Sequence, residues 1–378
     1  MKKIVFIDVD GFALVQFRAP LLQRLCKAGL EVVVCSGSFR ENDQAHLEKI
    51  GCRVVQISLQ RTGVDPREDR KTRRHLHDFL RRERPDAVVA RAAKAVAYAL
   101  PEAKKLGIQI RVGFMTGLGA MFHPSTNWER VIGIIGRRVI LRGLRSATQI
   151  WALNSDDRAA LKRLNAASEG VTIELMDSDG IDTNRFTSSP LPDTPTFCFI
   201  GRMIPAKGVR VFLDAASEVR SRRSDIQFIV AGEPDQHRNT VKVDELRSLE
   251  RSRIIQYAGF VEDLEGLMKK ISCLVLPSFH EGRPRTVIEA LSSGRPVIVS
   301  DAVGCRDAIQ DGHEGIVVPR GDHLKLAKAI EELADSRETM EKMARCARDT
   351  ALTRYAEAIV VKRFMNQLML EEQNSSLS

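Results

Sequence analysis

Aromatic side chains are scarce in this sequence, at 5% of its 378 residues. No segment interleaves aromatic and basic residues as proteins that stack nucleic-acid bases do, and no nucleic-acid-reading motif is recognisable. We therefore expect no nucleic acid among the partners. No apolar run approaches the ~20 residues that span a bilayer, and the first residues enter a strand pattern without the apolar core of a signal peptide. The sequence thus predicts a cytoplasmic protein.

Cysteine is sparse as well. The seven thiols are scattered and odd in number, and they include no CxxC pair and no metal-ligand spacing. This pattern is typical of free thiols in a reducing compartment and excludes a disulfide framework or a zinc site. We accordingly expect no metal and no required cofactor.

What the sequence does contain is a regular alternation of short apolar runs with helical patterns. Such runs indicate buried parallel strands connected by helices, and a chain of 378 residues exceeds one ordinary core. The cluster of Pro, Ser and Thr at 186–195 is the clearest linker. We predict an α/β fold with two Rossmann-like, doubly wound domains, 1–188 and 189–356, and a helix over 357–372 that packs back on the first. The predicted strands are KIVFIDV, LEVVVCS, CRVVQI, DAVVA, IQIRVGF, TQIWAL and VTIEL in the first half, and PTFCFI, IQFIVAG, RIIQYAG, SCLVLP, RPVIVS and EGIVVP in the second.

Positive charge is concentrated in the N-terminal half. Residues 1–190 contain 31 Lys and Arg against 21 Asp and Glu, a net +10, whereas residues 191–378 contain 27 against 28, a net −1. A basic half suggests an anionic partner. Residues 61–86 are rich in both signs and fit a solvated helix face equally well. Residues 130–145 interleave Ile, Val and Leu with arginines, which is typical of a helix on an anionic lipid surface, although a buried helix with basic ends fits the same pattern.

The opening stretch FIDVDG raises a separate possibility. Asp8 and Asp10 follow an apolar strand, as in the nucleophile loop of haloacid-dehalogenase-type phosphatases, but the same letters fit a strand that ends in a turn. The phosphatase hypothesis finds no convincing lysine motif and leaves the second half unexplained. We favour a structural Asp8 and a turn in which Gly11, having no side chain, lets backbone N–H groups approach a phosphate.

The densest chemistry lies in the second half. Glu281 and Glu289 flank the predicted start of a helix, where the N–H groups of residues 285–287 form an anion site. Carboxylates do not bind phosphate, so their natural targets are sugar and ribose hydroxyls. Arg202 and Lys207 follow another strand. The forked guanidinium of Arg202 and the compact charge of Lys207 together suit a pyrophosphate.

Four segments of this half follow one another in order: Gly201-Arg202, Lys207-Gly208, Glu281-Gly282-Arg283-Pro284 with Glu289-Ala290, and Gly294-Arg295-Pro296-Val297. Together they resemble the donor-site signature of the retaining glycosyltransferases of family 4, which have the GT-B fold. The resemblance covers essentially the whole second half.

This resemblance implies a role for each matching residue. Arg202 and Lys207 would hold the diphosphate of a sugar nucleotide, and Glu281 would contact the transferred sugar; these three form the predicted catalytic set. Glu289 would bind the ribose hydroxyls. Enzymes of this fold usually need no divalent metal, because basic side chains supply the positive charge. The predicted donor-binding residues are Gly11, Gly201, Phe260, Val261, Gly282, Arg285, Thr286, Val287 and Glu289, with Phe260 and Val261 nearest the base.

Further segments match in order: Phe17–Leu21, Thr116–Gly119, Leu153–Asp157, Asp179–Phe186 and Gly304–Asp307. They resemble bacterial family 4 enzymes that extend polyprenyl-diphosphate-linked saccharides, for example by transferring N-acetylgalactosamine to a diacetylbacillosamine lipid. The resemblance implies a UDP-N-acetylhexosamine donor and a lipid-linked acceptor at the cytoplasmic face of the inner membrane, which agrees with the basic first half and with residues 130–145.

The chain departs from the family pattern at two places. The segment before the TGLG loop, residues 111–115, lacks the usual histidine, and Asp10-Gly11 replaces a Gly-Gly turn. Sugar-nucleotide epimerisation or phosphorolysis on the same fold remains an alternative activity. The candidate acceptor or loop residues are Asp10, Arg18, Thr116, Gly117, Gly119 and His123.

Overall fold

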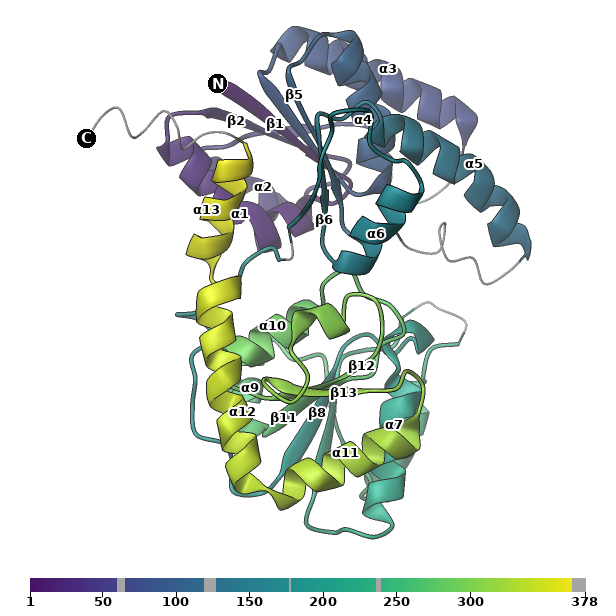
Figure 1. Cartoon of the computed structure of the whole chain (residues 1–378), viewed down its shortest axis with the longest axis vertical. Helices are drawn as coiled ribbons and strands as arrows, with labels where there is room; N and C mark the ends of the chain where they lie inside the picture. Colours follow the sequence, from purple (N-terminus) through teal and green to yellow (C-terminus); the bar gives the residue numbers. More distant parts are fainter. Residues whose placement is uncertain (60–64, 119–126, 177, 236–238, 369–378) are drawn as a thin grey trace. The chain divides into compact units, whose positions relative to one another are not determined.

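A computed structural model describes residues 1–59, 65–118, 127–176, 178–235 and 239–368, with the backbone alone at 13, 17, 66, 127–132 and 135. The chain divides into two units (Figure 1). Unit 1 consists of residues 1–179 and 360–378, and unit 2 of residues 180–359. The chain therefore first passes from unit 1 to unit 2 after residue 179, nine residues before the boundary predicted at 188.

Each of the thirteen apolar runs forms a strand, so the predicted α/β fold with two parallel sheets is confirmed. In unit 1 all seven strands are parallel, in the order β3-β2-β1-β4-β5-β6-β7. Continuous apolar strands suit this arrangement because helices cover both faces of the sheet. The strands are β1 (Lys3–Asp8), β2 (Glu31–Ser36), β3 (Arg53–Gln56), β4 (Ala87–Arg91), β5 (Ile110–Met115), β6 (Gln149–Ala152) and β7 (Ile173–Leu175).

The alternation of side chains along β1 separates two apolar cores in unit 1. Val5 and Ile7 face the core that includes side chains of α3 to α6, whereas Ile4 and Phe6 face the core that includes side chains of α1, α2 and α13. The helices are α1 (Gly11–Lys27), α2 (Glu41–Lys49), α3 (Pro66–Glu83), α4 (Ala93–Lys105), α5 (Asn127–Leu144), α6 (Ser155–Arg163) and α13 (Glu357–Gln367), of which the part from Val360 onward belongs to unit 1.

The last helix returns to the first unit (Figure 1), and α13 lies beside α1 although it ends the described chain. Its Phe364 is 1% exposed and packs among Phe6, Phe114 and Trp151, with ring centroids 4.4–6.5 Å away. Offset and edge-on aromatic contacts at this range are favourable. A helix over the first part of the predicted 357–372 segment is therefore present and closes the core of unit 1.

Unit 2 contains a six-stranded parallel sheet in the order β10-β9-β8-β11-β12-β13 around a single large core. Its strands are β8 (Thr196–Ile200), β9 (Gln227–Ala231), β10 (Gln256–Gly259), β11 (Cys273–Leu276), β12 (Val297–Ser300) and β13 (Gly315–Val318). Its helices are α7 (Val209–Arg220), α8 (Val243–Arg251), α9 (Leu264–Lys270), α10 (Arg285–Ser292), α11 (His323–Asp335) and α12 (Arg337–Thr350), with the short helices η1 (Pro205–Lys207), η2 (Arg306–Ala308) and η3 (Ala351–Tyr355).

The predicted linker belongs to unit 2 because two arginines bind its carbonyls. Buried Arg295 donates to the carbonyl of Ser189 in the linker at 2.8 Å. It also donates to the carbonyl of Met268 in α9 at 2.7 Å and so connects the linker to unit 2. Arg348 donates to the carbonyls of Phe186 at 2.8 Å and Thr183 at 3.1 Å. These bonds satisfy the backbone of a segment without regular structure, and they place the boundary between units before it.

Each sheet reverses its strand order once. The reversal lies between β1 and β4 in unit 1 and between β8 and β11 in unit 2. In open parallel sheets, ligands bind beyond the carboxyl ends of the strands at such a point. The loops that follow these four strands are therefore the places to look for a site.

Candidate active site

In unit 2, two charged side chains meet at the reversal of strand order. Lys207 follows β8 and Glu281 follows β11, and the Lys207 Nζ lies 2.6 Å from the Glu281 Oε1. Both are partly accessible, with 25% and 11% of their side chains exposed. The hydroxyl of buried Ser278 donates to the same Glu281 oxygen at 2.8 Å. A cation and an acceptor-only carboxylate are thus held side by side at the edge where ligands bind.

The backbone explains why these two loops meet. Gly208 has a φ of +71°, and a Cβ there would lie 1.9 Å from the carbonyl oxygen of Pro277, so only glycine allows this approach. The N–H of Phe279 donates to the carbonyl of Ala206 at 2.8 Å. The loops after β8 and β11 are therefore joined directly beside Lys207.

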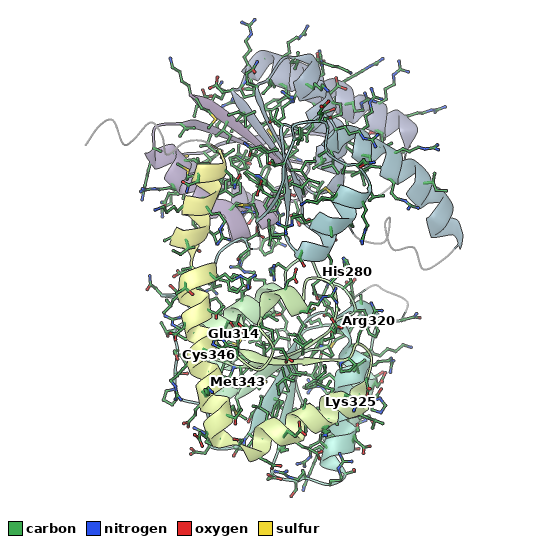
Figure 2. All side chains as sticks on the ribbon, in the orientation of Figure 1. His280, Glu314, Arg320, Lys325, Met343 and Cys346 are labelled. Atoms are coloured by element: carbon green, nitrogen blue, oxygen red, sulfur yellow. The ribbon has the colours of Figure 1, made fainter. Side chains whose placement is uncertain are left out.

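A third loop supports the carboxylate from the other side. The N–H of Glu281 donates to the carbonyl of Val303, which follows β12, at 2.9 Å. His280, which is labelled in Figure 2, immediately precedes Glu281 in the sequence. The position of Glu281 is thus set by three consecutive loops of the sheet.

Glu289 lies one turn inside α10 and is 6% exposed. Arg285 donates through Nε to Glu289 at 3.0 Å and through NH1 to the carbonyl of Gly180 at 3.2 Å. Burial raises the pKa of Glu289, and the charge of Arg285 opposes this effect. Helix geometry directs the N–H groups of residues 285–287 out of the start of α10, as the sequence predicts.

Arg202 follows β8, as predicted, and lies beside an acid that was not predicted. Its side chain is 61% exposed, and its NH1 pairs with Asp235 at 2.6 Å. The hydroxyl of Thr240 accepts from the N–H of Asp235 and donates to the carbonyl of Met203, which ties this loop to the one after β8. Asp235 was not predicted, although its position four residues beyond the end of β9 marks it as a residue at a carboxyl end of the sheet.

The remaining predicted donor residues lie in the same unit. Phe260 follows β10 and is 67% exposed, whereas Val261 packs partly against the core of unit 2. Gly201 follows β8. Gly282 and Thr286 are half-buried, and the side chain of Val287 is fully buried, so that Val287 offers only its backbone.

The reversal of strand order in unit 1 is occupied by an internal network of charges. Fully buried Asp8 accepts from Arg91 NH1 at 2.8 Å and from the N–H of Val9 at 2.7 Å. Arg91 also contacts Asp179 at 3.4 Å, and Asp179 pairs with Arg18. Burial raises the pKa of Asp8, and the charge of Arg91 opposes this effect. A buried carboxylate paired in this way does not suit the nucleophile of the phosphatase hypothesis.

Arg18 is also inside unit 1. It is 2% exposed, and its guanidinium lies 4.7 Å from the ring centroid of Phe114 and 5.3 Å from that of Phe364. Burial lowers its pKa to about 10. The predicted acceptor contact therefore does not fit this side chain, whose partners are Asp179 and two aromatic rings.

Gly11 is required for a reason that differs from the predicted one. Its N–H donates to the carbonyl of Ser38 at 3.0 Å, and a Cβ there would lie 2.5 Å from that oxygen and 2.3 Å from the ring of Phe39. The amide thus joins the loop after β1 to the loop after β2 and is not available to a phosphate. Asp10 caps α1 by accepting from the N–H of Phe12 at 3.1 Å.

Asp10 also lines a groove of about 1380 Å³ in unit 1. The groove begins at the carboxyl ends of β1 and β2 and continues along β3, the edge strand, beneath α3. Its lining includes Val9, Asp10, Ser38, Ile57, Phe79 and Arg82.

Thr116 and Gly117 follow β5, and Gly117 has a φ of +137°. Gly119 and His123 lie outside the described residues. Within the described ranges, no group of three or more His, Cys, Asp or Glu side chains could hold a metal ion.

The outer surface of unit 1 carries positive charge. Exposed basic residues of α3 to α5 and the residue after α5 form what we call the basic face: Arg67, Arg70, Lys71, Arg74, Arg81, Arg82, Lys104, Lys105, Arg138, Arg142 and Arg145. Of the described side chains of these helices, Asp78 is the one exposed acid. On α5, Ile140 and Leu144 are buried while Ile134 and Val139 are 48% and 37% exposed.

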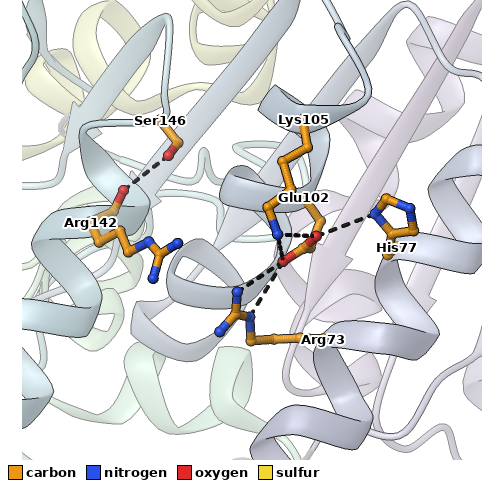
Figure 3. A network of polar contacts seen from close by, with 6 residues as sticks. All are labelled: Arg73, His77, Glu102, Lys105, Arg142 and Ser146. Carbon is orange, nitrogen blue, oxygen red and sulfur yellow. Dashed lines mark hydrogen bonds and ion pairs between the residues drawn. The ribbon is translucent and has the colours of Figure 1, made fainter.

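A polar network joins two helices of this face (Figure 3). Glu102 of α4, 4% exposed, accepts from Arg73 NH2 at 3.1 Å and from Lys105 Nζ at 2.9 Å, and His77 Nδ1 lies 3.2 Å away. The buried carboxylate therefore has three basic partners, two of them on α3. Among the described helices, none is both long enough and apolar enough to cross a membrane.

Two family models match this chain. The model described as "Glycosyl transferase 4-like domain" matches residues 15–173, and "Glycosyl transferases group 1" matches residues 194–336. Together they cover most of both units. The chain is a glycosyltransferase. Its two parallel α/β units have the GT-B fold.

Characterised glycosyltransferases are similar over most of the chain. The N,N'-diacetylbacillosaminyl-diphospho-undecaprenol alpha-1,3-N-acetylgalactosaminyltransferase of Campylobacter jejuni is 22% identical over 377 residues, which cover 96% of this chain and 97% of the relative. The alpha-D-kanosaminyltransferase of Streptomyces kanamyceticus is 27% identical over 273 residues, 66% of this chain and 68% of the relative. The Anabaena protein HepE, solved in complex with UDP, superposes with a TM-score of 0.76 at 18% identity, covering 98% of this chain and 100% of HepE, a likeness that shows the fold.

Proposed function

We propose that this glycosyltransferase is a retaining enzyme that transfers a sugar from a UDP-N-acetylhexosamine to a polyprenyl-diphosphate-linked saccharide. The contact of Lys207 with Glu281 at the reversal of strand order carries the proposal, because an ammonium group suits a phosphate and a carboxylate suits sugar hydroxyls. The similarity to the Campylobacter jejuni enzyme along nearly the whole chain supports the choice of acceptor.

In the proposed reaction the acceptor hydroxyl bonds to the sugar carbon from the face that the diphosphate leaves, and its proton passes to the departing diphosphate. As the bond to the diphosphate breaks, negative charge grows on the departing group, where Lys207, Arg202 and the first-turn amides of α10 stabilise it. Positive charge grows on the sugar ring, which Glu281 orients from the opposite side. Glu289 binds the ribose hydroxyls, and Phe260 lies against the base. Since side chains supply the positive charge, we expect transfer to continue when a chelator removes divalent metal.

We assign the acceptor to unit 1. The groove that contains Asp10 reaches the carboxyl ends of β1 and β2 and has both apolar and basic lining, which suits a saccharide joined through a diphosphate to a lipid. Substitution of Asp10 by Ala is expected to raise KM for the acceptor while leaving KM for the donor unchanged.

The decisive experiment is transfer by the purified protein. UDP-N-acetylglucosamine and UDP-N-acetylgalactosamine are each incubated with a short-chain polyprenyl-diphosphate saccharide, with and without EDTA, and the product mass and anomeric configuration are determined. Transfer with retention, abolished in Glu281→Ala, is expected. Absence of transfer with every nucleotide sugar tested, or near-normal activity of Glu281→Ala, would reject the proposal.

We also propose that the basic face binds the anionic membrane in which the acceptor resides. Exposed Ile134 and Val139 lie on the same helix as Arg138 and Arg142, an arrangement that suits the lipid headgroup region. The protein is expected to float with vesicles that contain phosphatidylglycerol and to dissociate as the salt concentration rises.

The double variant Arg138→Glu/Arg142→Glu tests the surface. It should lose vesicle binding while transfer to a water-soluble acceptor analogue continues. Arg320→Glu/Lys325→Glu makes the same change of charge on exposed residues of unit 2 (Figure 2) and serves as the control. Equal loss of binding in both double variants, or no binding by the unmodified protein at low salt, would refute a specific membrane surface.

A further inference from the structure

We propose that Cys26 and Cys52 form a reversible modification site in unit 1, at which a small oxidised thiol such as glutathione disulfide converts the two thiols into an internal disulfide. This proposal does not depend on the donor or the acceptor, because both cysteines lie outside the sites described above.

The two sulfur atoms are already neighbours. Cys26 lies at the end of α1 and Cys52 directly before β3, and their Sγ atoms are 3.8 Å apart. A disulfide bond is about 2 Å long, so the sulfur atoms must approach by roughly 1.8 Å. Formation of the bond therefore requires rotation about the side-chain bonds of the two cysteines.

The surroundings give a small disulfide access to one of the two thiols. Cys26 is partly exposed, whereas Cys52 is 5% exposed. Exposed Gly51 directly precedes Cys52, and a Cβ at that position would come within 3.3 Å of the Cβ of Cys26. Cys26 is therefore the thiol that meets the oxidant, and Cys52 is placed to resolve the mixed disulfide.

The exchange balances without any further reactant. Cys26 loses its proton to solvent, and its thiolate attacks one sulfur of glutathione disulfide, so that one glutathione thiolate leaves. Cys52 then loses its proton and attacks the sulfur of Cys26, which releases the second glutathione thiolate. Two protein thiols have been oxidised, and one disulfide has been reduced to two thiols.

The burial of the two thiols also predicts how the rate of this exchange depends on pH. Burial raises the pKa of the Cys26 thiol, and burial raises the pKa of the Cys52 thiol as well. Because the thiolate is the attacking species, exchange should be slow near pH 7 and accelerate as the pH rises. In a reducing compartment both thiols remain free, and an oxidising challenge forms the bond.

The chain provides its own controls. Cys198 and Cys273 lie on the neighbouring strands β8 and β11 and are fully buried, so a small disulfide has no access to them. Cys346 of α12 is partly exposed in unit 2 (Figure 2). Oxidation governed by exposure alone would modify Cys346 as readily as Cys26.

The test uses the full chain with all its cysteines. The protein is incubated with glutathione disulfide at pH 8, denatured and alkylated, and its disulfides are mapped by mass spectrometry. We expect a peptide that links Cys26 to Cys52 and a higher melting temperature, because the bond closes the loop between α1 and β3. A dithiol reductant should reverse both changes.

Cys26→Ser and Cys52→Ser should each abolish the cross-link, whereas Cys346→Ser should leave it intact. In Cys52→Ser, glutathione should remain attached to Cys26, which shows that Cys52 is the resolving thiol. The proposal is overturned if glutathione stays on Cys26 of the unsubstituted protein, or if oxidation leaves both thiols unmodified.

Discussion

The contact between Lys207 and Glu281 makes a quantitative prediction about both activity and stability. Replacing Lys207 by Ala removes the cation that the proposed mechanism sets against the departing diphosphate. Loss of one preorganised group of this kind lowers kcat by about 10²–10³, or about 3–4 kcal/mol of transition-state stabilisation. Substrate binding changes less, because Arg202 and the start of α10 remain.

The same substitution should destabilise unit 2 by an intermediate amount. A surface ion pair contributes about 0–1 kcal/mol, and breaking a fully buried pair costs about 3–5 kcal/mol. The Lys207 and Glu281 side chains are 25% and 11% exposed, and their charged atoms are 2.6 Å apart. The pair is therefore neither a surface pair nor a fully buried one. We therefore expect a loss of about 1–3 kcal/mol, softened by the hydrogen bond that Ser278 still donates to Glu281.

A double-mutant cycle measures the interaction energy between Lys207 and Glu281 separately from the contribution of each side chain alone. Lys207→Ala, Glu281→Gln and the double variant are compared by chemical denaturation and by steady-state transfer, with calorimetry of UDP binding as a third measure. Lys328 forms an exposed pair with Glu332 at 3.4 Å on α11, with side chains 67% and 62% exposed, and Lys328→Ala is the matched control. The double variant should lose less stability than the sum of the two single variants.

Two results would contradict this reasoning. If kcat of Lys207→Ala stays within about threefold of the unsubstituted enzyme, Lys207 does not stabilise the departing charge. If the stability losses simply add, the two side chains do not interact in solution.

Three further predictions follow from other parts of the molecule. Glu102→Gln should cost about 1–3 kcal/mol by denaturation at pH 7, since its three basic partners lose a charged acceptor. Burial alone would raise the pKa of Glu102, but hydrogen bonds from Lys105 and Arg73 outweigh burial and lower it. The stability that Glu102 adds relative to Gln is therefore present above the ordinary carboxyl pKa and should disappear as the pH falls through the lowered pKa of Glu102. An equal loss of stability in Glu102→Gln at every pH would exclude an electrostatic cause. Phe364→Ala should cost about 3–5 kcal/mol and unfold unit 1 before unit 2 in hydrogen exchange, and simultaneous loss of both units would argue against this assignment of α13. Phe260→Ala should raise KM for the nucleotide sugar by about tenfold or more with no change in melting temperature, because the proposed role of this exposed ring is to stack on the base and the ring does not support the core; an unchanged KM would remove Phe260 from the donor site.

The sheets were predictable because parallel strands covered on both faces are continuous apolar runs. Each run of this kind, from KIVFIDV to EGIVVP, became a strand. The boundary between units was less accessible, because Arg295 and Arg348 bind the Pro- and Ser-rich linker to unit 2 through contacts between residues more than a hundred positions apart. Composition marks the absence of regular structure but does not reveal which unit holds the segment.

The site shows the same division between local and tertiary information. Lys207 and Glu281 each follow a strand, and because ligands bind at the carboxyl ends of parallel strands, their sequence positions made both of them candidates. The partner of Arg202, Asp235, lies in the loop after a different strand, β9, so spacing alone could not pair the two side chains. Gly11 was selected for the correct property, the absence of a side chain, but the atom that approaches it belongs to Ser38 after β2. Sequence position identifies strand ends, whereas the packing between loops assigns their partners.

The return of α13 to unit 1 has a consequence for synthesis of the chain on the ribosome. Unit 2 is one continuous segment. The aromatic core of unit 1, in contrast, cannot be completed until Phe364 is synthesised, long after Phe6, Phe114 and Trp151. At about 5–20 residues per second, the delay after Trp151 is roughly 10–40 s. Unit 2 can therefore fold first, although unit 1 begins the chain. During that interval the nascent chain exposes an unfinished apolar surface to chaperones, and a stop codon before Phe364 would leave it permanently open.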